Sequence, residues 1–134
     1  MAATVCVENQ GGKWAFEFEF TVTTSGAIVN DADGFSCTDP TVVVARTDTG
    51  TYTATLPGTF YKTLYRNCKL NEATPTAAEA DITAISLDGG VADATGGATC
   101  LVTIKTMDDN ASPAAADLSV GTISCRLVFQ KNKL

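Results

Sequence analysis

The sequence predicts an all-β protein: an antiparallel β-sandwich or jelly-roll-like domain of about seven or eight strands with little helix. Two observations predict this fold class. Short segments alternate apolar and polar residues with a period of two, as strands with one buried face do. Glycine, proline, aspartate and asparagine residues separate these segments at short intervals. The length of 134 residues fits a single domain, 1–134, with one hydrophobic core.

The clearest strand signal lies in residues 14–22. Large apolar side chains occupy every second position of this segment, namely Trp14, Phe16, Phe18, Phe20 and Val22. A helix would scatter these side chains around its axis, whereas a strand places them on one face. Such a face needs a second sheet to cover it, which favours a sandwich over a single sheet.

Residues 41–56 predict a β-hairpin. Its first half is rich in β-branched residues, Asp48-Thr49-Gly50 supplies the turn, and its second half alternates again. Glycine at the end of the turn is free to adopt positive φ. The expected core-facing side chains of the second strand are Tyr52, Ala54 and Leu56. Its expected solvent-facing side chains are Thr51, Thr53 and Thr55.

Further strands are expected at 4–8, 82–87, 100–106 and 122–130. In the last of these, one face would carry Ile123, Cys125, Leu127 and Phe129. Residues 60–70 fit either a short helix or a strand, whereas 76–81 and 113–117 each fit a turn or two of helix. The Ala- and Thr-rich stretch 73–80 is expected to connect the two sheets.

The net charge of −6 disfavours nucleic-acid binding, and the Lys and Arg residues are scattered along the chain. The short basic tail Gln130-Lys131-Asn132-Lys133 is expected to be solvated. The first ten residues lack the pattern of a signal peptide, and no segment has the run of apolar residues that a membrane span requires. We therefore expect no membrane partner and synthesis in a cytoplasm.

The five cysteines lie far apart, without the close pairs of a zinc or thioredoxin-like motif. Because their number is odd, at least one thiol has no partner within the chain. Cys100 and Cys125 fall within alternating apolar segments, where a free cysteine behaves as a small buried hydrophobe. The sequence leaves open whether any two of the five form a disulfide.

The search for reactive groups predicts no catalytic residue, no cofactor and no metal. The chain has no histidine, which removes the usual general base and the histidine-containing zinc sites. Glu17 and Glu19 share a strand face, but it is opposite to the aromatic face and should point to water. The fragment 30–34 resembles part of a calcium loop, but it lacks the remaining ligands and fits a turn better. The Gly-rich stretch 89–97 fits a hairpin loop.

Tyr61 and Tyr65 allow two interpretations. They can pack into the core, as most aromatic residues of a small domain do. Alternatively, they can project from the surface and anchor a partner, since tyrosine offers a large contact area at a low entropic cost.

The hairpin segment 42–57, with Tyr61 and Leu64, resembles small structural proteins encoded by tailed bacteriophages. In those proteins a "v-x-R-x-G-x-G-x-Y-T-v-T-L" hairpin follows a "W-x-F-x-F" strand, and the chain closes on a strand like 127–132. The resemblance covers most of residues 13–132. It implies a virion component, specifically a capsid decoration or cement protein made in the host cytoplasm. Such a protein would bind the major capsid protein at the capsid surface as a homotrimer or homodimer.

Three classes of function therefore stay open: a virion structural protein, a tail-associated or cell-surface carbohydrate- or receptor-binding module, and a small enzyme. The missing histidine makes the enzyme the least favoured of the three. For the structural protein, an uncharged Thr row beside a sheet edge would suit contact with a neighbouring subunit. The candidate subunit-contact residues are Thr51, Thr53, Thr55, Tyr61 and Tyr65.

Overall fold

The computed structural model describes residues 4–9, 12–22, 28–29, 43–72, 79–89, 98–107 and 121–132, which contain nine strands and no helix. The strands are β1 (Thr4–Asn9), β2 (Lys13–Val22), β3 (Ile28–Val29), β4 (Val43–Asp48), β5 (Thr51–Pro57), β6 (Lys62–Glu72), β7 (Glu79–Ser86), β8 (Thr99–Met107) and β9 (Gly121–Gln130). None of these residues belongs to a helix long and apolar enough to cross a membrane.

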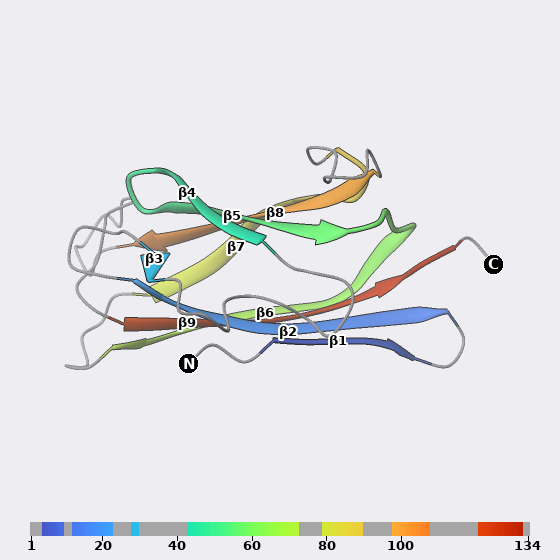
Figure 1. The fold of residues 1–134 in the computed structure, drawn as a ribbon, viewed down its shortest axis with the longest axis horizontal. Helices are drawn as coiled ribbons and strands as arrows, with labels where there is room; N and C mark the ends of the chain where they lie inside the picture. Colours follow the sequence, from blue (N-terminus) through green and yellow to red (C-terminus); the bar gives the residue numbers. More distant parts are fainter. Residues whose placement is uncertain are drawn as a thin grey trace.

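The strands form two antiparallel sheets that pack face to face (Figure 1). One sheet has the order β1-β2-β9-β6, with β3 paired to β2, and the other has the order β4-β5-β8-β7. The predicted all-β, antiparallel sandwich is confirmed. The described residues hold more strands than the expected seven or eight because residues 60–70 contribute a strand and the two-residue β3 joins β2.

β2 and β9 supply one wall of the core, with the predicted parity. Their registered pairs include Phe16 with Leu127, Phe18 with Cys125 and Phe20 with Ile123. All six side chains are at most 4% exposed. A strand places every second side chain on the same face, so the order of residues alone fixes which side chains enter this wall.

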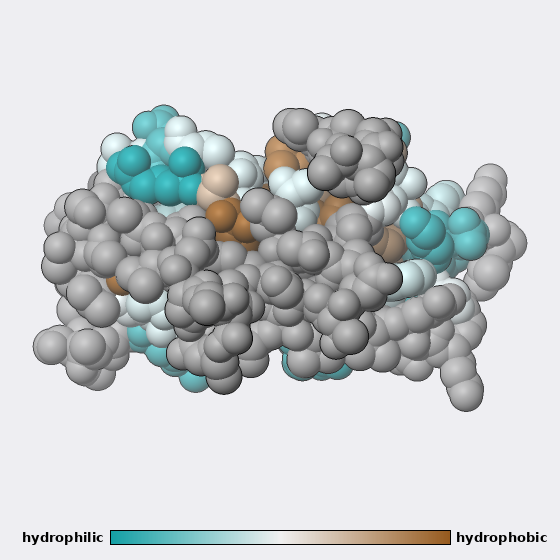
Figure 2. Space-filling view, viewed as in Figure 1, coloured by the Kyte–Doolittle hydropathy of each residue, from teal (hydrophilic) through white to brown (hydrophobic). Residues whose placement is uncertain are grey.

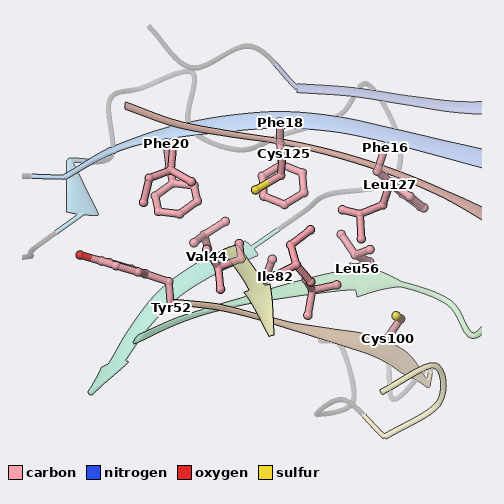
Figure 3. Packing of buried hydrophobic residues seen from close by; sticks show 14 of the residues in the cluster. Phe16, Phe18, Phe20, Val44, Tyr52, Leu56, Ile82, Cys100, Cys125 and Leu127 are labelled. Atoms are coloured by element: carbon pink, nitrogen blue, oxygen red, sulfur yellow. The ribbon is translucent and has the colours of Figure 1, made fainter. Parts of the chain in front are cut away.

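β4, β5, β7 and β8 supply the opposite wall, which Figure 3 shows facing the first. Tyr52, Ala54 and Leu56 of β5 are fully buried, as predicted. The turn between β4 and β5 contains Gly50 at φ 60°, which confirms the role expected of this glycine. In Figure 2 the end of the molecule that carries this turn is the hydrophilic region at the upper left.

Residues 60–70, which fit either helix or strand, contribute a strand, and of the possible helical turn 76–81 the structure describes only 79–81, which are strand; residues 76–78 lie outside the described residues. Residues 62–72 form β6, and residues 79–81 begin β7 instead of ending a helical turn. The helical interpretation of 79–81 is wrong because Ala80 and Ile82 are both buried while their neighbours Asp81 and Thr83 are exposed, which is a period of two. β6 and β7 lie in different sheets, so the segment that joins them connects the sheets, as expected. The segments 30–34 and 113–117 lie outside the described residues.

The expectation of a solvated tail is wrong at Lys131. This residue is half-buried, and its ammonium group donates a 2.7 Å hydrogen bond to the Thr59 carbonyl. The same group lies 5.0 Å from the centroid of the Phe60 ring, while the backbone N–H of Lys131 donates to the Gly12 carbonyl at 2.8 Å. Lys131 therefore ties the end of β9 to two turns of the sandwich.

Candidate interaction surface

β6 lies at one edge of its sheet and presents the candidate surface. It pairs with β9 along one side, and no strand in the described part of the chain pairs with its other side. Edge strands carry unpaired backbone groups, so natural proteins protect them with charges and bulges or use them to bind a partner. β6 has both protective features.

Three large apolar side chains are exposed along this edge. Tyr61, Leu64 and Tyr65 have exposed fractions of 45%, 41% and 46%, and they are the exposed large hydrophobic residues of the described structure. Phe60, directly before them, is buried and stacks on Phe129 with ring centroids 4.5 Å apart. Core packing is therefore the wrong interpretation for the two tyrosines, while the adjacent phenylalanine anchors the segment.

A β-bulge explains why Tyr65 faces solvent. Thr63 pairs with Phe129 and Tyr65 pairs with the next residue of β9, Val128, so Leu64 has no partner on β9. If the register of Lys62 and Thr63 continued without a shift, Tyr65 would pair with Leu127, whose side chain is fully buried. The bulge thus moves Tyr65 from the core register to the outer face and leaves Leu64 exposed.

Three cations lie on the same segment as these exposed apolar side chains. Lys62, Arg66 and Lys69 are exposed on β6, which gives this one strand a third of the nine Lys and Arg residues in a chain of net charge −6. Within the described structure none of the three makes an ion pair. We call these six residues, Tyr61, Lys62, Leu64, Tyr65, Arg66 and Lys69, the β6 surface.

Arg126 of β9 connects the β6 surface to the rest of the outer face. Its guanidinium lies 5.6 Å from the centroid of the Tyr65 ring, and its Nε is 3.4 Å from a carboxylate oxygen of Glu17 on β2. Both partners of this ion pair are more than half exposed, so the pair orients the guanidinium more than it stabilises the fold. Tyr65 is therefore held against a neighbouring strand on one side and is free on the other.

Two shallow, open hollows adjoin the β6 surface. One lies between the sheets and is lined by Thr63, Leu64, Tyr65 and Arg66 of β6 with Ile85 of β7. The other lies on the outer face, where Glu17 and Glu19 of β2, Ser124 and Arg126 of β9, and Asn67 and Lys69 of β6 surround it. The first hollow is lined by polar and apolar side chains together, including the cation of Arg66, so it suits a side chain that carries an acidic group.

The three threonines predicted as contact residues lie on the second sheet, away from the β6 surface. Thr51, Thr53 and Thr55 are half-buried on the outer face of the second sheet, and β5 lies between β4 and β8 rather than at an edge. The Thr51 hydroxyl donates to the Thr49 carbonyl at 3.2 Å and so belongs to the hairpin turn. The structure brings Tyr61 and Tyr65 together on the β6 segment, but it places the three threonines on the other sheet.

The carboxylates Glu17 and Glu19 both contact side chains of β9. Glu17 pairs with Arg126, and Glu19 accepts a 3.4 Å hydrogen bond from Ser124, on the outward face predicted for both carboxylates. No three potential metal ligands cluster within the described ranges. Burial, with a smaller contribution from the negative charge of Asp88, raises the pKa of the Cys100 thiol to about 12, so this thiol is protonated at neutral pH.

Cys125 is buried, as predicted, and has an unexpected neighbour. Cys68 of β6 pairs with it in register, and the two sulfur atoms are 3.5 Å apart. The hydrogen bond between the two thiols, together with burial, raises the pKa of Cys125. The sequence could not predict that Cys68 lies beside Cys125, because the spacing of cysteines along the chain does not reveal which strands are neighbours.

Four members of the β6 surface are not among the predicted contact residues: Lys62, Leu64, Arg66 and Lys69. One signal in the sequence could have found them: β6 combines large apolar residues with three cations, a combination that suits a strand edge better than a core.

Comparisons of this chain with protein-family models, with curated proteins and with solved structures found no match.

Proposed function

We propose that this chain is a non-enzymatic structural protein of a virion, a decoration or cement protein that binds the outer surface of a phage capsid and stabilises it. The observation that carries the proposal is the exposure of Tyr61, Leu64 and Tyr65 along the edge strand β6. Large apolar side chains grouped on a rigid element mark a surface that binds another protein. The resemblance of residues 13–132 to small phage structural proteins suggests which protein that is.

The β6 surface has the composition of a protein contact. Tyrosine and arginine are enriched at the residues that dominate binding energies, and the surface offers both. Lys62, Arg66 and Lys69 favour an acidic patch on the partner. In a chain of net charge −6, such a local cluster of cations also orients the molecule as it approaches that patch.

The partner of the proposal is the major capsid protein, with the chain assembled as a homotrimer or homodimer on the shell. A capsid presents many identical sites, so several modest contacts made at once hold an oligomer far more tightly than one contact holds a monomer. A small, rigid sandwich is suited to this role because little conformational entropy is lost when it binds.

The first test is the copy number of this chain in purified particles of the phage that encodes it. Quantitative mass spectrometry would compare its peptides with those of the major capsid protein. A near-stoichiometric ratio is expected for a decoration protein. Absence from the particle, or only a few copies in it, would contradict the proposal.

The second test asks which face makes the contact. The triple variant Tyr61→Ser, Leu64→Ser, Tyr65→Ser should bind undecorated particles at least about tenfold more weakly than the unchanged chain in a co-sedimentation assay, because it removes three exposed contact residues. Each of these residues is more than half covered, so the variant should lose some stability but stay folded, which its thermal unfolding would check. The matched control is Thr53→Lys on the other sheet. Loss of binding in Thr53→Lys alone would place the contact on the Thr row instead.

A carbohydrate- or receptor-binding module is the second candidate, and one observation favours it. The exposed rings of Tyr61 and Tyr65 lie on the same segment as the exposed Asn67, and aromatic rings with nearby amides suit a sugar. A glycan array probed with the chain separates the two candidates. Binding to a defined glycan that is lost in Tyr65→Ser would favour this function, whereas particle binding without glycan binding favours the decoration protein.

A further inference from the structure

Cys68 and Cys125 are held opposite each other on neighbouring strands. They are partners in the antiparallel register of β6 and β9, and the Cys125 thiol donates to the Cys68 sulfur at 3.5 Å. Directly opposed residues of antiparallel strands have Cα atoms about 4.5 to 5.5 Å apart. That range falls within the roughly 4.4 to 6.8 Å that a disulfide spans. The backbone therefore already has a spacing that a disulfide accepts.

We propose that Cys68 and Cys125 are a cross-strand disulfide site, which a small-molecule disulfide such as oxidised glutathione closes, and that the bond fixes the edge strand β6 to β9. The two sulfur atoms must approach by about 1.5 Å to reach the bond length of about 2.05 Å. Rotation of the two side chains supplies this movement. The inference concerns the covalent chemistry of the fold and does not depend on the proposed function.

The exposure of the two thiols sets the order of the chemistry. Cys68 is half-buried and reaches solvent at the sheet edge, whereas Cys125 is 4% exposed. The Cys68 thiolate attacks one sulfur of the small disulfide and releases one small thiolate. Cys125 then loses its proton to solvent and attacks the Cys68 sulfur, which releases the second small thiolate. Two protein thiols are oxidised by two electrons, and one small disulfide is reduced to two thiols.

Once Cys68 has reacted, its hydrogen bond no longer raises the pKa of Cys125, but burial still does, and this makes the second step the slow one because only the thiolate attacks. Cys100 does not compete for either sulfur. It belongs to β8 in the other sheet, and Figure 3 shows its sulfur at a different place along the core from that of Cys125. Cys100 is therefore a matched control cysteine for the pair.

The sequence allows an unambiguous test. Cleavage after Lys and Arg places each of the five cysteines on a different tryptic peptide, with Cys68 on 67–69 and Cys125 on 106–126. The folded chain would be incubated with oxidised glutathione, its remaining thiols alkylated at low pH, and the digest analysed by mass spectrometry without reduction. We expect peptide 67–69 joined to peptide 106–126 at the expense of two hydrogens.

Three variants sharpen the result. Cys100→Ala should keep the linked peptides, and Cys68→Ser should lose them. Cys125→Ala should leave Cys68 trapped as its glutathione adduct, because the resolving thiol is gone. The proposal is overturned if, in the unchanged chain, Cys68 stays free, remains a glutathione adduct, or links to a cysteine other than Cys125.

The effect on β6 is measured separately. The bond would close a loop between residues that are 57 positions apart, and constraining an unfolded chain to this extent should raise the melting temperature of the oxidised form by about 10 °C over the reduced form. Cys100→Ala should show the same difference, and Cys68→Ser should show none. A linked protein whose melting temperature is unchanged or lowered would contradict the claim that the bond fixes β6.

Discussion

At the scale of single residues, Lys131 and Lys13 show how the same side chain takes different roles. Lys13 is exposed at the start of β2. Lys131 binds the Thr59 carbonyl and lies over the Phe60 ring, so its charge is used by the fold. The ring of Phe60 in turn stacks on Phe129 and meets Phe16 edge-on at 5.7 Å between centroids. Lys131, directly after β9, thus holds the segment before β6 in place through Thr59 and Phe60.

Replacing Lys131 with methionine should lower the free energy of unfolding by about 1 to 2 kcal/mol, because the variant loses a charged hydrogen bond and a cation–π contact while it keeps most of its apolar stem. Urea unfolding followed by the fluorescence of the single tryptophan, Trp14, would measure the change. Lys13→Met is the control and should change the stability little. Equal effects of the two substitutions would contradict the role given to Lys131.

At the scale of elements, turns and edges determine what the strands present. Among the described strands β6 pairs on one side only, and its bulge turns Tyr65 outward. Directly before β2, Gly12 has a positive φ of 75°, and its carbonyl accepts a hydrogen bond from the backbone N–H of Lys131. A Cβ atom added at Gly12 would meet nothing within 4 Å, so space does not select glycine there. The backbone conformation selects it.

Gly12→Ala should therefore destabilise the fold by about 1 to 2 kcal/mol through backbone strain alone. Gly12→Asn should cost less, because asparagine tolerates the left-handed region better than other residues with a Cβ. The midpoints of urea unfolding would give both values. Identical losses in the two variants would show that strain at this φ is not the cause.

At the scale of the whole molecule, the two sheets close one core but offer different outer faces. The first sheet carries charged residues, among them the Glu17–Arg126 ion pair and Lys69. On the second sheet the registered pair Thr53 and Thr103 lies between the small residues Ala45 and Ala84. A partner that contacts β6 meets cations and tyrosines, whereas one that contacts the middle of β5 meets threonine and alanine; nearer the turn, Thr51 is in register with Lys105, and Lys105 with Asp81.

The buried Cys100 makes the stability of the whole fold depend on alkaline pH. Its pKa rises from 9.0 to about 12 on folding, so below pH 9 the thiol is protonated in both states and contributes no pH dependence. Between about pH 9 and 12 only the unfolded state loses the proton, and the free energy of unfolding should fall by up to about 1.4 kcal/mol per pH unit.

Urea unfolding at about pH 8 and about pH 10.5, with reductant present, would measure this loss. Cys100→Ala should lose less stability between the two pH values than the unchanged chain, although its stability at the lower pH is reduced by the missing sulfur. All other groups, Cys125 included, are the same in the two proteins, so the difference between them isolates Cys100. An equal loss in the two proteins would contradict the raised pKa.

The fold was largely predictable from the sequence, whereas the candidate surface was predictable only in part. Tyr61 and Tyr65 were selected, but their exposure was one of two open interpretations. Leu64, Arg66 and Lys69 were missed because their placement depends on the strand that pairs with β6 and on the bulge between Thr63 and Tyr65. The threonines were assigned to the correct face of β5, yet β5 itself is not an edge strand.

The sequence by itself determined which side chains of β2, β5 and β9 enter the core, because successive residues of a strand point to opposite faces and the apolar residues follow that period. It also determined the turn at Gly50, where local backbone geometry selects glycine. Only the tertiary structure decided that β6 lies at an edge, that Tyr65 faces solvent and that Cys68 meets Cys125. These features depend on pairing between strands far apart in the chain, and the register of such pairs is a property of the assembled sheet.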